Sequence, residues 1–142
     1  MTATNNNNYL GQSQWLPNGD VTLLPGVGAM AVLPTNWPTT PVWFIGLVRE
    51  SVTTQIKAGT NYLGSALPIA GGISSGLKYT NATSGDLLLK WDANNQVFVT
   101  YTSDGGTNWS PSEPYIGLAE GFILKSASNH TWVQTFSPCG GN

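Results

Sequence analysis

Apolar residues along the chain occur in short segments that alternate with polar residues, and no long window has the spacing of an amphipathic helix. Segments rich in β-branched and aromatic residues are bounded by turn residues, among them 17 Gly and 9 Pro. This pattern is typical of strands and excludes long helices. It predicts strands near residues 20–24, 27–34, 41–48, 51–57, 60–67, 86–91, 96–102, 115–118, 120–126 and 131–136. The predicted fold is an all-β, antiparallel β-sandwich of about 8–10 short strands with hairpin connections.

One hairpin is well marked. Residues 92–96 (Asp-Ala-Asn-Asn-Gln) separate two strand-like segments, 87–91 and 97–101. Asn and Asp tolerate the left-handed backbone that hairpin turns require. Side chains alternate along a strand, so one face of the segment after the turn is expected to be core and the other half-exposed.

The chain length fits one domain. We predict a single β-sandwich over residues 15–138 and a short C-terminal tail over residues 139–142. Residues 1–14, with four consecutive Asn, offer little to bury. We expect them to be a tail that is disordered or extended unless a partner orders it.

The chain carries little charge. Only 8% of its residues are charged, against about 25% in an average soluble domain. Five scattered Lys and Arg do not form the basic cluster that nucleic acids or anionic membranes require. The net charge of −2 does not oppose self-association, and the chain itself is the expected partner, with glycans as a further possibility.

Targeting signals are equally sparse. The longest apolar run, near residues 41–48, is far shorter than the roughly 20 residues of a membrane-spanning helix, so membrane insertion is not expected. Residues 1–14 lack the basic start and apolar middle of a signal peptide. An extracellular or cell-surface location would therefore need a different native start or another export route.

The two ends of the predicted domain are weakly similar. Trp15-Leu-Pro leads to a Gly-containing apolar segment and an aromatic return segment, and Trp109-Ser-Pro does the same. Either β-hairpins with Gly and Trp merely look alike, or the hairpins near residues 15–46 and 109–138 are equivalent. Equivalent hairpins would meet within one subunit or between subunits.

Residues 102–109 (Thr-Ser-Asp-Gly-Gly-Thr-Asn-Trp) resemble an Asp-box, with a departure at Asn108, where the pattern has Thr. The resemblance implies a hairpin capped by Asp104, with Gly106 in the turn and Trp109 packed beneath it. On chemical grounds as well, Asp104 is expected to accept hydrogen bonds from the amides of a Gly-Gly turn. The motif is structural and not catalytic.

A longer stretch, from Tyr62 to Pro138, resembles a repeat module of secreted and surface proteins from Verrucomicrobia, Planctomycetes and related bacteria. The matching segments are Tyr62-Leu-Gly-Ser, Gly85-Asp86, Trp91, Trp109-Ser-Pro-Ser-Glu-Pro, Glu120-Gly-Phe and Trp132-Val-Gln-Thr-Phe-Ser-Pro. This resemblance implies a β-rich extracellular module and brings no catalytic residues with it.

The sequence shows no recognisable combination of catalytic residues. His130 is the only histidine; the sequence contains no nucleophile elbow, and His130 is expected at the surface. Asp86, Glu113 and Glu120 are candidates for a glycosidase pair, but the first fits a turn and the second a loop. Residues 92–96 space oxygen ligands as calcium loops do, yet lack the closing acidic ligand. We predict no enzymatic activity, no cofactor and no metal.

Aromatic residues remain as contact candidates. Trp43, Trp91 and Trp132 lie within predicted strands and are expected in the core. The candidates for assembly or ligand contact lie beside turn residues: Trp15, Trp37, Trp109 and Tyr115. Such aromatics serve protein interfaces and sugar binding alike. The single cysteine, Cys139, forms an intermolecular disulfide, stays a free thiol or has no role.

Together these features favour a structural module, a subunit of an extracellular filament, surface layer or similar self-assembly. Two alternatives stay open. One is a carbohydrate-binding or adhesion module that uses exposed Trp and Tyr. The other is a decoration or tail protein of a virion, which would explain the absence of a signal peptide.

Overall fold

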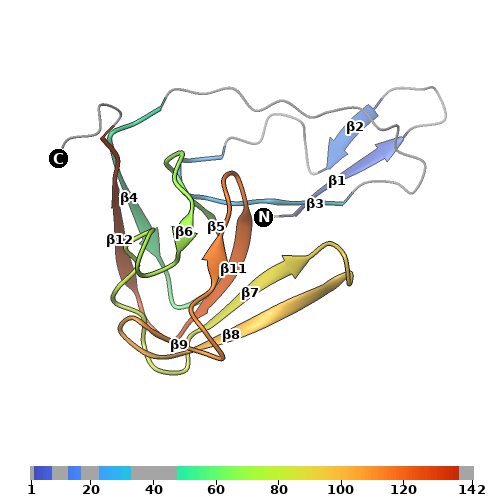
Figure 1. The fold of residues 1–142 in the computed structure, drawn as a ribbon. Helices are drawn as coiled ribbons and strands as arrows, with labels where there is room; N and C mark the ends of the chain where they lie inside the picture. Colours follow the sequence, from blue (N-terminus) through green and yellow to red (C-terminus); the bar gives the residue numbers. More distant parts are fainter. Residues whose placement is uncertain (1, 8–12, 17–22, 33–47, 138–142) are drawn as a thin grey trace.

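The computed structural model describes residues 2–7, 13–16, 23–32 and 48–137 (Figure 1). Within these residues the chain is all-β, without helices, and its sheets are mainly antiparallel, which confirms the predicted fold class. The described strands are β1 (Thr2–Asn7), β2 (Ser13–Leu16), β3 (Met30–Val32), β4 (Ser51–Ile56), β5 (Gly59–Gly64), β6 (Gly71–Gly72), β7 (Leu87–Asp92), β8 (Val97–Gly105), β9 (Asn108–Ser110), β10 (Tyr115–Ile116), β11 (Gly121–Ser126) and β12 (His130–Thr135).

Two pairs of consecutive strands form the centre of the molecule. Residues 51–56 of β4 pair antiparallel with residues 130–135 of β12. Residues 59–64 of β5 pair antiparallel with residues 121–126 of β11. Because β4 runs into β5 and β11 runs into β12, the two pairs form one long ladder. The ladder bends in the middle, so its halves belong to different sheets.

The bend has a simple origin in the chain. Residues 57–58 on one side face residues 127–129 on the other, so the two strands differ in length at this point. An unequal count interrupts pairing and turns a ladder, as β-bulges do. Asn129 compensates for one lost backbone bond, because its Oδ1 accepts the Ala58 N–H at 2.9 Å.

The bent ladder encloses the hydrophobic core. In β4 the buried side chains are Val52, Thr54 and Ile56, and in β12 they are Trp132 and Gln134, as period-two alternation requires. Opposite them lies the five-stranded sheet, in the order β5-β11-β7-β8-β9. The core cluster draws on both sheets and on the segments between them: Ile56, Leu63, Ile73, Leu77, Tyr79, Ala82, Leu88, Trp109, Ile116, Phe122, Leu124 and Trp132. The two sheets therefore pack across one core, in the manner of a β-sandwich.

The N-terminal residues form a separate small sheet, in the order β2-β1-β3, in which β3 runs parallel to β1. The prediction of a tail over residues 1–14 differs from this arrangement, because residues 2–7 are extended and paired within the chain. The predicted boundary after residue 14 falls inside β2. Backbone hydrogen bonds make such a pairing independent of the polar Asn side chains.

The predicted equivalence of two terminal hairpins is not observed. The prediction of a hairpin near residues 109–138 is wrong, because β11 and β12 belong to different sheets and pair with β5 and β4. In the other segment, residues 17–22 and 33–47 lie outside the described residues, and β3 pairs with β1.

Candidate functional site

The hairpin of β7 and β8 extends away from the rest of the molecule (Figure 1). The predicted turn over residues 92–96 is confirmed, since Asp92 lies opposite Val97 and the ladder continues to Leu87 opposite Thr102. Asp92 holds the turn: its Oδ1 accepts the N–H of Asn94 at 2.9 Å. Its Oδ2 accepts the Asn95 side-chain amide at 2.7 Å. The hydrogen bonds from Asn95, followed by that from Asn94, lower the pKa of Asp92.

The outer half of this hairpin is apolar on both faces and exposed. On one face, the rings of Trp91 and Phe98 pack edge to face, with centroids 4.9 Å apart, and each residue is 42% exposed. On the other face, Val97 and Val99 are 49% and 36% exposed. The prediction that Trp91 lies in the core is wrong, and on the expected core face of residues 97–101 only Tyr101 packs against the core cluster. The reason is that β11 pairs with β7 only as far as Lys90, so neither sheet covers the hairpin beyond it.

The outer side of β8 is only partly paired. β9 lies along β8 at Thr102, Ser103 and Gly105. Within the described parts of the chain, no strand pairs with residues 97–101 on that side. We call this stretch the free edge of β8. An unpaired apolar edge is a template for adding another strand.

The register shows which backbone groups the free edge offers. Ser103 faces the β7 side, because its N–H donates to the Asp86 carbonyl at 2.8 Å. Backbone groups point alternately to the two sides of an antiparallel strand, and the β7–β8 register is regular, so every second residue back to Val97 also faces β7. The N–H and C=O groups of Phe98 and Thr100 therefore point outward.

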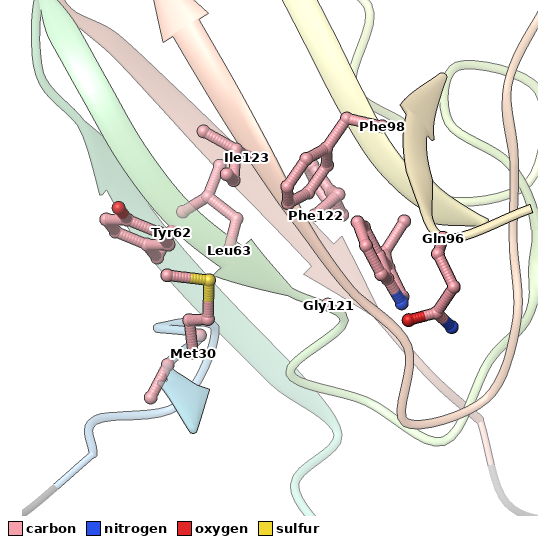
Figure 2. Close-up of a pocket in the computed structure, with 11 residues that line it drawn as sticks. Met30, Tyr62, Leu63, Gln96, Phe98, Gly121, Phe122 and Ile123 are labelled. Atoms are coloured by element: carbon pink, nitrogen blue, oxygen red, sulfur yellow. The ribbon is translucent and has the colours of Figure 1, made fainter. Parts of the chain in front are cut away.

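A groove lies on the face of the five-stranded sheet that points away from the core. It has a volume of about 710 Å³. Figure 2 shows Met30 and Tyr62 on one side of it, and Phe98 and Gln96 on the other. Ile123, which lies opposite Tyr62 in the ladder, is also part of the lining, as is Trp91. None of the described residues that line the groove is charged.

Two glycines position the segment that forms one wall of this groove. Gly26 has a φ of +83°, and a Cβ there would collide with Thr54 Oγ1. A Cβ on Gly28 would lie 2.8 Å from the Leu63 carbonyl oxygen. Without side chains, these residues bring the backbone against β5, where the Gly28 N–H donates to the Tyr62 carbonyl at 2.8 Å.

The predicted contact residues do not gather into one site. Trp109 is only 7% exposed and donates its indole N–H to Ser74 Oγ at 3.1 Å, which fits packing beneath the Asp-box-like turn and not a role as a contact residue. Tyr115 is 60% exposed in β10, and its backbone carbonyl accepts a hydrogen bond from Lys90 Nζ at 2.7 Å. Trp15 lies in β2, opposite Asn5. Trp37 and Cys139 lie outside the described residues.

The Asp-box-like turn is held differently from the prediction. Ser103 Oγ accepts the Gly105 N–H at 3.0 Å, while the Asp104 side chain is exposed. The prediction that Asp104 accepts the turn amides is therefore wrong. A register shift after Ser103 lets Gly105 and Gly106 adopt positive φ, and Gly106 donates its N–H to the Ala82 carbonyl at 2.8 Å. The motif remains structural, with its Trp packed inward.

A buried polar cluster around Asp86 was not predicted. Asp86 is fully buried, and its Oδ1 accepts the Ala127 N–H at 2.8 Å. Its Oδ2 accepts the Thr83 N–H at 2.9 Å and the Ser126 hydroxyl at 3.2 Å. The cluster links the start of β7 to the bend of the ladder. Burial and the negative charge of Asp86 raise the pKa of Tyr79, whose hydroxyl has no hydrogen-bond partner among the described residues.

His130 borders this cluster, and the prediction of a surface histidine is wrong, since its side chain is only 10% exposed. Its Nε2 lies 3.6 Å from Asp86 Oδ2 and 3.2 Å from Ser128 Oγ. A Ser-His-Asp triad uses the two ring nitrogens for two different partners. Here a single nitrogen faces both groups, so the arrangement is that of a structural polar cluster.

The other two candidate carboxylates accept hydrogen bonds from backbone N–H groups and so hold loops in place. Glu113 Oε1 accepts the N–H groups of Ser74 and Ser75, both at 2.7 Å. Burial opposes ionisation of Glu113, but these bonds outweigh it and lower its pKa. Glu120 accepts the Gly117 N–H at 2.7 Å and pairs with Lys90 at 3.2 Å. Within the described residues, no group of three His, Cys, Asp or Glu is placed to hold a metal ion.

Replacing Glu113 with Gln is expected to lower the free energy of unfolding by about 1 kcal/mol at neutral pH, since the neutral amide accepts weaker bonds at an exposed site. The folded-state pKa of Glu113 is lowered. The contribution of the Glu113 carboxylate to the free energy of unfolding is therefore complete above the ordinary Glu pKa. It is lost as the pH falls through the lower pKa of the folded state. Urea unfolding of both proteins at neutral pH and at about pH 3 measures this. A difference that does not shrink in acid contradicts the prediction.

Comparisons with protein-family models, with curated proteins and with solved structures found no match to this chain. Across the described ranges, no helix is long and apolar enough to cross a membrane. The resemblance over residues 62–138 stays a prediction.

Proposed function

We propose that this protein is a non-enzymatic structural module that self-assembles through its β7–β8 hairpin. The observation that carries the proposal is the hairpin's outer half, which combines apolar side chains on both faces with the free edge of β8. Such a combination exposes apolar surface and unpaired backbone groups together. A second protein surface that covers the hairpin would bury the apolar side chains and form hydrogen bonds with the unpaired backbone groups.

The exposed apolar surface is large enough for a stable contact. With full surfaces of about 150–250 Å² per large side chain, Trp91 and Phe98 each leave roughly 60–100 Å² in water. With the other exposed residues nearby, the total is on the order of 500 Å². These other residues are Val97, Val99, Met30 and Tyr115. A standard interface buries about 800 Å² per partner, a little over half of it apolar.

The charge distribution supports association between copies. The net charge of −2 gives little repulsion, and the groove beside the hairpin has no charged lining among the described residues. Lys90, the nearest cation, is paired with Glu120. A subunit of an extracellular filament, surface layer or comparable array fits this surface and the predicted resemblance to surface-protein modules.

A carbohydrate is the second candidate partner. It is favoured by the exposed Trp91–Phe98 pair beside the Gln96 amide, since sugar faces stack on aromatic rings. Besides Gln96, the described lining of the groove offers only the Tyr62 hydroxyl and the Trp91 indole N–H as hydrogen-bonding side-chain groups. Self-assembly therefore remains the main proposal.

Replacing Val97 with Lys is expected to abolish self-association, because a charge on the hairpin would have to lose its water in the contact. Val133→Lys is the matched control: Val133 is 48% exposed, against 49% for Val97, but it lies on β12. Light scattering across a concentration series and electron microscopy measure assembly. A native protein that stays monomeric at the highest concentration contradicts the proposal. If its tryptophan fluorescence then responds to a polysaccharide, the second candidate replaces it.

A further inference from the structure

The free edge of β8 limits how a strand can pair with it. Only Phe98 and Thr100 have outward N–H and C=O groups that no described strand uses. Toward the C-terminus, β9 occupies the edge from Thr102 onward. Toward the N-terminus, Gln96 has a φ of +55° and lies in the turn. A partner strand therefore has two residues with which to form hydrogen-bonded pairs.

We propose that β8 pairs antiparallel with β8 of a second copy, about a two-fold axis that passes beside Val99. This inference rests on the proposed function and names its partner and register. Phe98 then lies opposite Thr100 of the second copy, and Thr100 lies opposite Phe98. Both pairs are hydrogen-bonded pairs, so all the outward groups of both copies are satisfied. Val99 lies opposite Val99 of the second copy.

Other registers satisfy fewer groups. A shift of two residues in one direction places Phe98 opposite Thr102, whose outer side β9 already occupies. A shift in the other direction places Thr100 opposite Gln96, in the turn. Each shift leaves a single hydrogen-bonded pair, whereas the proposed register has two. A shift of one residue would place outward groups opposite inward ones.

The side chains are compatible with this register. Val99 meets its own copy across the axis, and Val97 lies opposite Tyr101, so that face of the new contact is apolar. On the other face, Phe98 lies beside Thr100, a pairing of the aromatic and β-branched kind that is favourable in sheets. No residue between 97 and 101 is charged. The edge therefore suits a second copy of itself. A charged strand of another protein would find no opposite charge along residues 97–101.

The test uses the full chain with Cys139→Ser, so that an introduced cysteine is the sole thiol. Val99→Cys is expected to form a disulfide between two copies on oxidation by diamide. Residues of a non-hydrogen-bonded pair have Cα atoms about 4.5 Å apart, within the range of disulfides. Val97→Cys is the matched control: it lies on the same face and is more exposed, yet in this register the two copies of residue 97 are four residues out of alignment. It is expected to stay uncross-linked.

The same test includes Thr100→Pro, which removes one outward N–H from each copy and keeps the bonds of β8 to β7. Thr100→Val, which retains that N–H, is its control. We expect Thr100→Pro to raise the dissociation constant about tenfold or more, because half of the backbone bonds of the contact are lost. Circular dichroism verifies that both variants fold.

Two failures are distinguishable. If the native protein does not associate at any concentration, the proposed function fails, and this inference fails with it. If the native protein associates while Val99→Cys does not cross-link, or Val97→Cys cross-links equally well, the register is wrong and the proposed function stands. Unchanged association of Thr100→Pro overturns the use of this edge.

Discussion

Replacing Asp86 with Ala is expected to lower the free energy of unfolding by about 3–5 kcal/mol, one of the two largest effects in the molecule. The carboxylate is fully buried and accepts three hydrogen bonds, two of them from backbone amides. Removing it takes the acceptor away from the part-buried Thr83 and Ala127 amides and empties a fully buried position, while the Ser126 hydroxyl keeps only the Ser128 carbonyl as a partner. The variant also loses the link between the start of β7 and the bend of the ladder at Ala127. Urea denaturation with a structural probe for each sheet measures the loss.

Asp92→Ala is the matched control for this prediction. Asp92 also accepts three hydrogen bonds, two of them from backbone amides, but it does so in the exposed hairpin turn. Water replaces the lost acceptor there, so a clearly smaller loss is expected. Equal losses for the two variants would show that burial does not set the value of these bonds. Asp86→Asn, which keeps one acceptor oxygen, is expected to fall between native protein and Asp86→Ala.

Replacing Trp132 with Ala is expected to cost about 3–5 kcal/mol, the usual range for removing a large aromatic side chain from a core. Trp132 is 1% exposed and packs against Tyr79 and Phe122, with ring centroids 6.0 and 6.2 Å away. Its indole N–H donates to the Leu77 carbonyl at 2.8 Å. The change therefore opens a cavity between the two sheets and leaves a buried carbonyl unpaired. Thermal and urea unfolding measure the effect.

Two variants separate these contributions. Trp132→Phe keeps most of the apolar volume and loses the hydrogen bond, with an expected cost of about 1–3 kcal/mol. Val133→Ala changes the neighbouring, 48% exposed residue and is expected to stay within about 0.5 kcal/mol of the native protein. If Trp132→Ala behaves like Val133→Ala, the two sheets do not share the core described above.

The strands that were predicted well are those whose side chains alternate between core and solvent. β4, β11 and β12 show this alternation in the sequence, and the structure has them within a few residues of their predicted positions. β1 was not predicted, because its Asn-rich residues give no burial signal while its backbone still pairs. β9 was missed because its three residues were assigned to a turn motif.

The candidate site depends on pairing between segments that are distant in the sequence, which a local sequence pattern does not reveal. Trp91 was placed in the core because it occupies a strand, but its exposure depends on where β11 stops pairing with β7. The free edge of β8 depends in the same way on where β9 ends, at Ser110 opposite Thr102. For Asp86, the sequence correctly indicated a turn into a strand. Its burial comes from Ser126 and Ala127, about 40 residues away, which no local pattern reveals.

The bent ladder has a consequence for how the chain folds. Residues 51–64 pair with residues 121–135, so the central contacts of both sheets join segments some 70 positions apart. Contacts between distant segments slow folding, because the intervening loop must close before they form. During synthesis, β4 and β5 emerge long before β11 and β12 and have no ladder partner until then. The apolar edge of β8 is thus present while the core is still open, when premature contacts between chains compete with folding.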